Sequence, residues 1–575
     1  MPQDTISYSA SDSEAQLDAD PQRTQSIIRL VAWLATGIVG FVQAWAFRFA
    51  IISDGNSYLD VATNYLRGDY NQAINAYWSP MVSWLLAVLM KIFHFSGRWD
   101  TTVFHLLNFA GLLIALRSFE FFFRIFLTFL GHTGDAPKDS LLQEAHWWLL
   151  GYGLFFSTML YVLTMEPVTP DVWVCVVSYL AVGLLLRIAQ RPEGWRDFAL
   201  LGLIMGLAYL TKSFYFPFSF VFLACAFWVG GQFRQSATRT AVALIVFALV
   251  SCPFVAVLSR AKQRFTFGDV GKIAYAMCIN PIDQIAFWQG ENHSGIPKHP
   301  TREVLSAPRV FEFAGPVSGS YPPFYDLSYW ADGVQSHFNI GGQLRILRQS
   351  VGTFYAILLV QSEFAVGLLV IFVLRAQFRE ILSALARIWL LWVAPCAACI
   401  AYALVLTENR YVAPFIVFIW LALFAAAVSA SSGISKRIVH AVVLAALLFT
   451  GAKTAKSFAS DLLTMRGMRN VHWDVAQSLA GIGLKPGDRL AVIATAGQNH
   501  WARLANVKVA AELPLGQEGL FWEGDQATQD RVFDAFRKTG SVAVLVKNPP
   551  LGCIRQGWTQ LGDTPYYLHS LTPAP

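Results

Sequence analysis

Residues 27–52 read IIRLVAWLATGIVGFVQAWAFRFAII, and residues 53–60 follow directly as SDGNSYLD. At about 1.5 Å per helical residue, the first stretch is long enough to cross a hydrocarbon core of about 30 Å. The span therefore ends in a carboxylate, Asp54, at the edge of the bilayer. A carboxylate held there on a rigid scaffold can act on a molecule that itself lies in the bilayer, so this junction favours an enzyme with a lipid-linked substrate.

The composition is that of a membrane protein. Apolar residues make up 55% of the 575 residues and charged residues 14%, and the mean hydropathy is +0.45. A water-soluble protein of this length cannot bury so much apolar surface, so most of the chain must face lipid or pack between membrane helices. The seven Cys show no disulfide or zinc spacing, and the net charge of +6 belongs to the inner loops and does not predict a nucleic-acid partner.

Runs of about 18 or more apolar residues predict about eleven transmembrane helices. These runs lie at 28–50, 101–127, 146–165, 170–188, 197–212, 214–231, 239–258, 352–374, 381–405, 411–430 and 437–452. Residues 81–95 are apolar but shorter, and we expect them to lie in the interface or to re-enter the membrane. The predicted fold is therefore a mainly α, polytopic membrane protein.

Lys and Arg in the short loops predict the orientation, because cytoplasmic loops carry an excess of both. One set of loops carries Arg187, Arg191, Arg196, Arg234, Arg239, Arg375, Arg379, Arg387, Lys436 and Arg437, and the opposite set carries only Arg67, Lys212 and Arg410. The N-terminus is therefore predicted to be cytoplasmic, and Asp54 and the C-terminus to lie outside. We expect a multi-pass protein of a bacterial inner membrane with a periplasmic C-terminus.

Three regions follow from these patterns. Residues 1–27 are rich in Ser, Asp and Gln and are predicted to be a disordered cytoplasmic tail. Residues 28–454 form the membrane domain, with outer loops at 51–100 and 259–351; the second loop is rich in Pro, Gly and aromatic residues. Residues 455–575 alternate strand and helix patterns, with strands near 489–495, 507–511 and 541–546 and a helix at 529–538, and predict a small soluble α/β domain on the outer face.

The segment after Asp54 has helical periodicity. Apolar residues recur at 58, 61, 62, 65 and 66, which predicts a short amphipathic helix capped by Ser57 and ended by Gly68. We expect this helix to lie on the outer membrane surface and to hold Asp54 at its edge. The alternative is that Asp54 only caps a helix or is a solvated loop acid.

A second acidic patch, Glu166 and Asp171, falls in the short turn between the third and fourth predicted spans, on the same side as Asp54. Charge this close to hydrocarbon costs about 2–3 kcal/mol per group unless it is paired or hydrated. The two acids are therefore predicted to pair with a base or to bind a divalent cation beside Asp54. The alternative is that Asp171 only caps the helix that follows Pro170.

Two isolated cations lie on this outer side as well. Lys212 ends the fifth predicted span and Arg410 opens the tenth. Both depart from the positive-inside pattern, which indicates that something anionic holds them there, and a lipid phosphate is the natural candidate. The alternatives are snorkelling of Lys212 to ordinary headgroups and an internal pair between Arg410 and Glu408.

The order of these motifs resembles that of the GT-C glycosyltransferases, and within them the branch of protein O-mannosyltransferases and lipid A aminoarabinose transferases. The resemblance covers about residues 28–430 and rests on several short motifs on one side of the membrane. These are an acid after the first span, a Tyr- and Ala-containing helix, Tyr77-Trp78-Ser79-Pro80, Pro170-Asp171, residues 206–212 (GLAYLTK) and Arg410-Tyr411.

The resemblance implies a sugar donor carried on a polyprenyl phosphate, because nucleotide sugars are absent outside the membrane. It implies that Asp54 is the general base, that Asp171 with Glu166 orients the acceptor or a metal, and that Lys212 and Arg410 neutralise the departing phosphate. It also places Tyr58, Tyr77 and Trp78 among the substrate-binding residues. Many relatives carry adjacent acids where this chain has Asp54 followed by Gly55, so a divalent cation on Asp54 and Asp171 remains an open alternative.

The sequence leaves the acceptor open between protein, lipid and glycan. The main alternative function is a transporter or flippase for a lipid-linked saccharide, which would also need charges in the membrane. Transporters commonly show internal repeats, and none is visible between the two halves of this chain. A third possibility is a non-catalytic assembly protein that docks through residues 81–95 and the C-terminal region.

Overall fold

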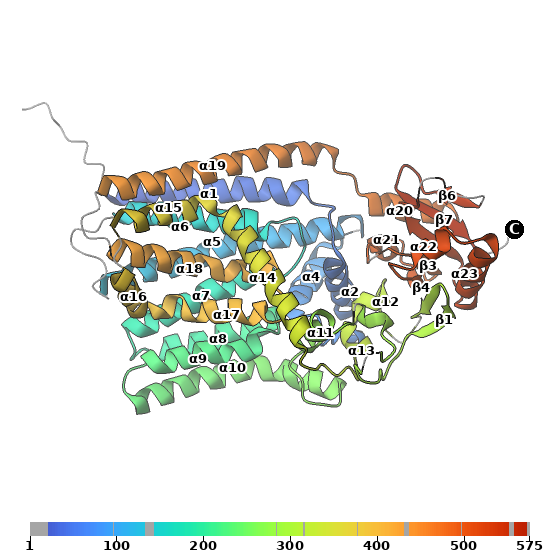
Figure 1. Cartoon of the computed structure of the whole chain (residues 1–575), viewed down its shortest axis with the longest axis horizontal. Helices are drawn as coiled ribbons and strands as arrows, with labels where there is room; N and C mark the ends of the chain where they lie inside the picture. The colour runs from blue at the N-terminus through green and yellow to red at the C-terminus, as the bar shows by residue number, and fades with distance from the viewer. Residues whose placement is uncertain are drawn as a thin grey trace, which may run out of the picture.

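The computed structural model describes residues 21–571, except for 96, 133–142, 283, 292, 314, 316, 376–377, 431–435, 496, 551 and 553–556. Long helices pack side by side into a bundle, and a β-sheet domain projects from one end of it (Figure 1). We refer to this end as the sheet end of the bundle. Most of the predicted tail, residues 1–27, lies outside the described residues, although its last part already belongs to the first helix.

The helices of the bundle follow the apolar runs of the sequence. They are α1 (Pro21–Ala46), α4 (Pro80–Phe93), α5 (Asp100–His132), α6 (Glu144–Ser157), α7 (Asp171–Gln190), α8 (Trp195–Thr211), α9 (Tyr215–Val229), α10 (Phe233–Ala261), α14 (Ile340–Val360), α15 (Ser362–Arg375), α16 (Phe378–Arg387), α17 (Val393–Ala403), α18 (Asn409–Ser429) and α19 (Lys436–Gly467). A π-helical segment, η2 (Thr158–Leu163), extends α6, and a 3₁₀ turn, η4 (Trp389–Leu391), joins α16 to α17.

Each predicted span coincides with one of these helices or with a consecutive pair. By length and composition, five helices among the described residues can cross a membrane, or up to seven if each bent pair is one span. The bent pairs are α14 with α15, at 83°, and α16 with α17, at 73°. The chain is therefore an integral membrane protein, and the number of about eleven spans remains a prediction. α19 continues past residue 454, where we predicted the membrane domain to end.

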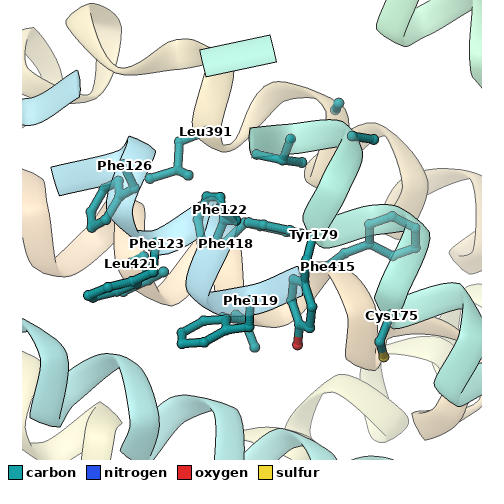
Figure 2. Close-up of a cluster of buried hydrophobic side chains, with 14 of the residues drawn as sticks. Phe119, Phe122, Phe123, Phe126, Cys175, Tyr179, Leu391, Phe415, Phe418 and Leu421 are labelled. Carbon is teal, nitrogen blue, oxygen red and sulfur yellow. The ribbon is translucent and has the colours of Figure 1, made fainter. Parts of the chain in front are cut away.

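Aromatic side chains fill the centre of the bundle (Figure 2). Phe119, Phe122, Phe123 and Phe126 recur every three or four residues along α5 and are buried against α7 and α18. The ring of Phe122 meets that of Phe418 edge to face at 4.9 Å between centroids. This periodicity turns one stripe of α5 into the core of the bundle, where it packs against α7 and α18.

The helix that carries Asp54, α2 (Ser53–Arg67), differs from its prediction at its N-terminus. It ends at Gly68, as expected, with φ 75, but it begins at Ser53 and not after a Ser57 cap. The Ser57 hydroxyl instead donates to the backbone oxygen of Ser53 within the helix. It also donates to the backbone oxygen of Phe324 in the outer loop at 259–351, which we refer to as the long loop. In addition, α2 packs against α4, α12 (Pro322–Tyr325) and the sheet domain, and its place on the outer membrane surface stays a prediction.

The outer loops contribute further short elements. These are α3 (Tyr70–Ala73), η1 (Gly97–Trp99), α11 (Val270–Cys278), η3 (Ile285–Phe287) and α13 (Leu327–Trp330). Of these, α11 and α13 lie with α2 and α12 between the bundle and the sheet domain (Figure 1).

The sheet domain has seven strands in the order β1-β2-β4-β3-β5-β7-β6. They are β1 (Arg302–Ser306), β2 (Arg309–Glu312), β3 (Arg489–Ile493), β4 (Lys508–Leu513), β5 (Ala543–Lys547), β6 (Trp558–Gln560) and β7 (Tyr566–Ser570). β3 runs parallel to β4 and β5, an arrangement typical of α/β domains such as the one predicted here. Helices cover both faces of the sheet: α23 (Gln526–Lys538) packs on one face, and α20 (Val471–Gly481) and α21 (His500–Leu504) pack on the other.

The hairpin β1–β2 belongs to the long loop and not to the C-terminal region. β2 pairs antiparallel with β4, with Phe311 opposite Glu512. The sheet is therefore wider than the predicted domain at 455–575, and the long loop is joined to it by backbone hydrogen bonds. This join fixes the long loop, and with it α12, over α2.

Candidate functional site

Asp54 lies in the first turn of α2, close to the turn that precedes α7. A Cβ at Gly55 would stand 2.5 Å from a methyl of Val168 and 3.1 Å from the Val168 carbonyl oxygen. Only glycine permits this approach of the two segments. The small residue after Asp54 therefore brings it beside Asp171, the first residue of α7.

Four of the predicted residues form one charge cluster at the sheet end of the bundle, although they come from α2, α7, α18 and the turn after α8. Arg410 Nη2 lies 3.1 Å from Asp54 Oδ2, and Arg410 Nε lies 3.8 Å from Asp171 Oδ2. Lys212 Nζ donates to Asp171 Oδ1 at 2.8 Å. We refer to Asp54, Asp171, Lys212 and Arg410 as the charge cluster.

Glu408 borders the charge cluster on its open side. Its Oε2 accepts a hydrogen bond from Arg410 Nε at 2.6 Å, and its side chain is 40% exposed, against 2% for Asp171. The pair between Arg410 and Glu408 that the sequence left open is therefore present together with the pair to Asp54. The exposed fraction of the side chain therefore rises from Asp171, which is buried, through Asp54, at 21%, to Glu408, which is the most accessible of the three acids.

The local electrostatics suit Asp54 to proton transfer. Burial raises the pKa of Asp54, the adjacent Arg410 opposes that shift, and Glu408 and Asp171 add to it. A raised pKa makes a carboxylate a stronger base while it remains ionised at neutral pH.

An aromatic wall lines one side of the charge cluster. The ring centroid of Trp78 lies 5.2 Å from that of Tyr58 and 4.6 Å from that of Tyr77, and its indole N–H donates to the Phe324 carbonyl. Burial raises the pKa of Tyr58, and Asp54 and Asp171 contribute to that shift. Burial also raises the pKa of Tyr77, and the charge of Asp54 contributes to that shift. These three predicted residues thus lie beside the charge cluster.

Glu166 lies elsewhere. Its side chain is exposed, and within the described ranges no hydrogen bond or ion pair joins it to the charge cluster. It lies near Asp461 of α19 instead, close enough for an electrostatic interaction between the two acids. The turn after residue 163 separates the two acids, since only Asp171 enters the α7 helix. We therefore leave Glu166 out of the proposed chemistry.

The sequence indicated no role for the two aromatic residues that contact Lys212, although Tyr411 belongs to one of its motifs. Its ammonium lies 3.7 Å from the ring centroid of Tyr411 and 5.6 Å from that of Tyr402. Cation–π contacts of this kind favour the charged form of a desolvated cation. Tyr402 gave no signal in the sequence because it falls within an apolar run.

The carboxylates do not fit a resident divalent cation well. Asp54 and Asp171 both pair with Arg410, whose guanidinium occupies the space between them. Among the residues that the structure describes, no three His, Cys, Asp or Glu side chains gather as metal ligands do. A divalent cation at this site stays an untested prediction.

Replacing Lys212 with methionine should weaken binding of a polyprenyl phosphate by about 10- to 100-fold, because a hydrogen bond to a charged group contributes about 1.5–3 kcal/mol. The measurement is a titration of the detergent-solubilised protein with the lipid. Lys453→Met is the matched control, because Lys453 also forms a salt bridge with an acid of the bundle, Glu363, but lies outside the charge cluster. Equal affinities of the Lys212 variant and the wild type would contradict the proposed phosphate contact.

Comparisons with known proteins agree with this architecture. Residues 148–256 match the family model described as dolichyl-phosphate-mannose-protein mannosyltransferase, and no curated protein sequence matches the chain. The solved structure of ArnT from Cupriavidus metallidurans bound to undecaprenyl phosphate is 12% identical, with a TM-score of 0.52, and the match covers 95% of this chain and 98% of that one. The apo structure of the same ArnT gives a TM-score of 0.51 with the same identity and coverage.

The oligosaccharyltransferase of Archaeoglobus fulgidus, solved in complex with Zn and sulfate, is also 12% identical, with a TM-score of 0.49, and the match covers 90% of this chain and 68% of that one. The family match falls on the segment from α6 to α10, which includes Asp171 and Lys212. The resemblance that the sequence indicated is thus confirmed: the chain has the fold of the ArnT structure over 95% of its length, and residues 148–256 match the mannosyltransferase family model.

Proposed function

We propose that this protein is a glycosyltransferase that moves a sugar from a polyprenyl-phosphate donor to an acceptor at the sheet end of the bundle. The observation that carries the proposal is the convergence of Asp54, Asp171, Lys212 and Arg410 from four distant segments. An ionised carboxylate and two cations at one place are the groups that a displacement of a phosphate from a sugar requires.

In the proposed reaction Asp54 removes the proton from the acceptor hydroxyl or amine. The acceptor atom then attacks the anomeric carbon as the bond from that carbon to the phosphate oxygen breaks, so the configuration inverts. The polyprenyl phosphate leaves with the electron pair of the broken bond. One base and one stabilised leaving group suffice, which distinguishes this site from the paired carboxylates of glycosidases.

Arg410 and Lys212 are assigned to the leaving phosphate. Arg410 presents a planar, permanently charged fork that matches phosphate oxygens, and Lys212 adds a compact charge. Asp171, which is buried and accepts from Lys212, is assigned to holding that cation in place. The ArnT structure with bound undecaprenyl phosphate supports a polyprenyl phosphate as the lipid partner.

We further propose a bacterial inner membrane, with the charge cluster and the sheet domain on the periplasmic side. The excess of Lys and Arg in the loops at the opposite end supports this orientation. In this orientation the donor reaches the site from the outer leaflet.

A flippase for the same lipid is the alternative to exclude. The test uses the purified protein in liposomes that contain a polyprenyl-phosphate sugar labelled in the sugar, together with candidate protein, lipid and glycan acceptors from the cell envelope. Transfer of label to an acceptor with release of polyprenyl phosphate supports the proposal. Movement of the intact donor between leaflets without release of polyprenyl phosphate would overturn it in favour of the flippase.

A further inference from the structure

A small cavity lies in the layer beyond the bundle, where the long loop meets the sheet. Its volume is about 290 Å³, and it is bounded by the segment after α11, by β2 and by the turn that follows β4. The cavity therefore exists only because the hairpin β1–β2 joins the sheet. It is built from three segments that are distant in sequence, and none of them contributes to the charge cluster.

One side of the cavity is apolar. Phe287 is partly buried and lines it, with its ring centroid 5.0 Å from that of Phe311. The guanidinium of Arg309 covers Phe311 at 4.7 Å from the ring centroid. Leu515 lines the same cavity and is 53% exposed. These contacts fix Phe287 as a rigid apolar surface.

The other side carries planar polar groups. Gln284, Glu291 and Gln517 line it. The Gln517 side-chain oxygen accepts from the Arg309 backbone N–H at 3.3 Å, which leaves its amide N–H groups available. One Glu291 oxygen accepts from the Gln289 backbone N–H at 3.0 Å. For Gln284 the described part of the chain shows no side-chain hydrogen bond, so its amide is also available.

The charge of the cavity does not favour an anion. Arg309 is paired with Glu303 at 3.0 Å and lies 3.8 Å from Glu291. Its positive charge is therefore already balanced by two carboxylates. A phosphate or carboxylate ligand would therefore gain little binding free energy from Arg309.

A pyranose ring has the complementary shape and chemistry. One face of the ring presents C–H groups, which pack on an aromatic surface, and its hydroxyls lie around the edge, where amides and carboxylates donate and accept. A cavity of this size, with one apolar wall and a few convergent polar groups, is typical of small-ligand sites. We propose that it binds a neutral saccharide unit of the acceptor. This proposal rests on the proposed function, and assigns the acceptor to the glycan-bearing class.

The cavity suits the acceptor and not the donor. A polyprenyl donor must keep its lipid in the bilayer, whereas this cavity includes residues of β2 and of the turn after β4, which belong to the sheet domain that projects from the end of the bundle (Figure 1). A soluble or surface-bound glycan has no such constraint, so the cavity is assigned to the acceptor.

The binding test uses the full chain in lipid nanodiscs and three neutral disaccharides, N,N′-diacetylchitobiose, cellobiose and maltose. We expect saturation-transfer NMR to detect at least one of them, with an affinity on the order of millimolar, because so small a ligand forms few contacts. The double variant Gln284→Ala/Glu291→Ala should lower the affinity by about tenfold, since two hydrogen bonds are lost. Glu523→Ala is the control, because Glu523 is exposed at the end of α22 (Glu518–Trp522) and does not line the cavity.

Thermal melting must show that the double variant remains folded. Absence of saturation transfer to all three disaccharides, or equal affinities of the double variant and the wild type, would overturn the proposal. Binding of a peptide from a candidate protein acceptor in place of the sugars, lost in the double variant, would overturn it as well and assign the cavity to a peptide.

The transfer assay separates this proposal from the proposed function. The double variant should raise the acceptor KM by about tenfold and leave the donor KM unchanged. Transfer with an unchanged acceptor KM would overturn the cavity proposal and leave the glycosyltransferase standing. Disaccharide binding without any transfer from a polyprenyl donor would support the saccharide site and overturn the proposed function.

Discussion

Asp54→Asn should lower kcat for sugar transfer by about 10²- to 10⁴-fold, the usual contribution of a general base. Binding of the polyprenyl-phosphate sugar should change by no more than about twofold, because asparagine keeps the size of the side chain and Arg410 remains in place. Single-turnover transfer and donor titration, measured side by side, separate the two effects.

Glu408→Gln is the discriminating control for this prediction. Glu408 also pairs with Arg410 and is more exposed than Asp54. If Asp54 is the base, loss of the Glu408 charge should cost about tenfold or less, as removal of one exposed partner of an ion pair does. A larger loss of kcat in the Glu408 variant than in the Asp54 variant would transfer the role of base to Glu408.

The pH dependence of the wild type follows from the same carboxyl. A general base works only when it is ionised, so activity is present above the pKa of Asp54 and is lost as the pH falls through it. Burial raises that pKa, so the acid limb of kcat should lie above the ordinary aspartate value of about 3.9. A profile of kcat against pH measures it, and Asp54→Asn should remove this limb from the residual activity.

Arg503→Ala should give the largest loss of stability. Arg503 lies on α21 of the sheet domain, and its guanidinium donates to Asp60 at 2.8 Å and to Asp100 at 2.9 Å. Both acids are buried. Removal of the arginine leaves two uncompensated carboxylates, and breaking a buried pair in this way costs about 3–5 kcal/mol.

The same change should reduce transfer, because Asp60 and Asp54 belong to one helix. The Ser320 backbone N–H and hydroxyl also hold Asp60, both at 2.8 Å, and His500 Nδ1 lies 2.9 Å from Asn56 Oδ1. The sheet domain thus holds one side of α2 while Asp54 meets Arg410 on the other. We expect kcat to fall with little change in donor affinity, because the donor contacts lie on α18 and after α8.

Thermal unfolding in detergent measures the stability loss. Arg537→Ala is the matched control, because Arg537 pairs with Asp534 on the exposed face of α23 and should cost about 1 kcal/mol or less. The triple variant Arg503→Met/Asp60→Asn/Asp100→Asn should recover much of the stability, since no buried charge is left unpaired. Equal melting temperatures of Arg503→Ala and Arg537→Ala would show that the ion pairs of Arg503 with Asp60 and Asp100 do not hold the domains together.

The parts of the fold that were predictable are those with strong local signals. The apolar runs located the bundle helices, Gly68 located the end of α2, and the charge asymmetry of the loops placed Asp54, Asp171, Lys212 and Arg410 on one side. Ionisable residues beside hydrocarbon are expensive, so their presence there is informative without any structure.

The parts that were not predictable depend on contacts between distant segments. Nothing near residues 302–312 shows that this hairpin pairs with β4, because the partner strand lies far along the chain. Arg503 is an ordinary arginine in the sequence, and its role exists only where α21 meets Asp60 and Asp100. The predicted start of α2 was wrong because Ser57 is a typical capping residue, yet its hydroxyl donates a hydrogen bond to the Phe324 carbonyl oxygen.

The most direct test is a structure of the protein in a lipid nanodisc with bound polyprenyl phosphate. We predict that the phosphate lies within hydrogen-bonding distance of both Lys212 and Arg410, with the first isoprene units against the bundle and Asp54 facing the open side. A phosphate bound elsewhere, with the pairs of Lys212 to Asp171 and of Arg410 to Asp54 undisturbed, would contradict the proposed site.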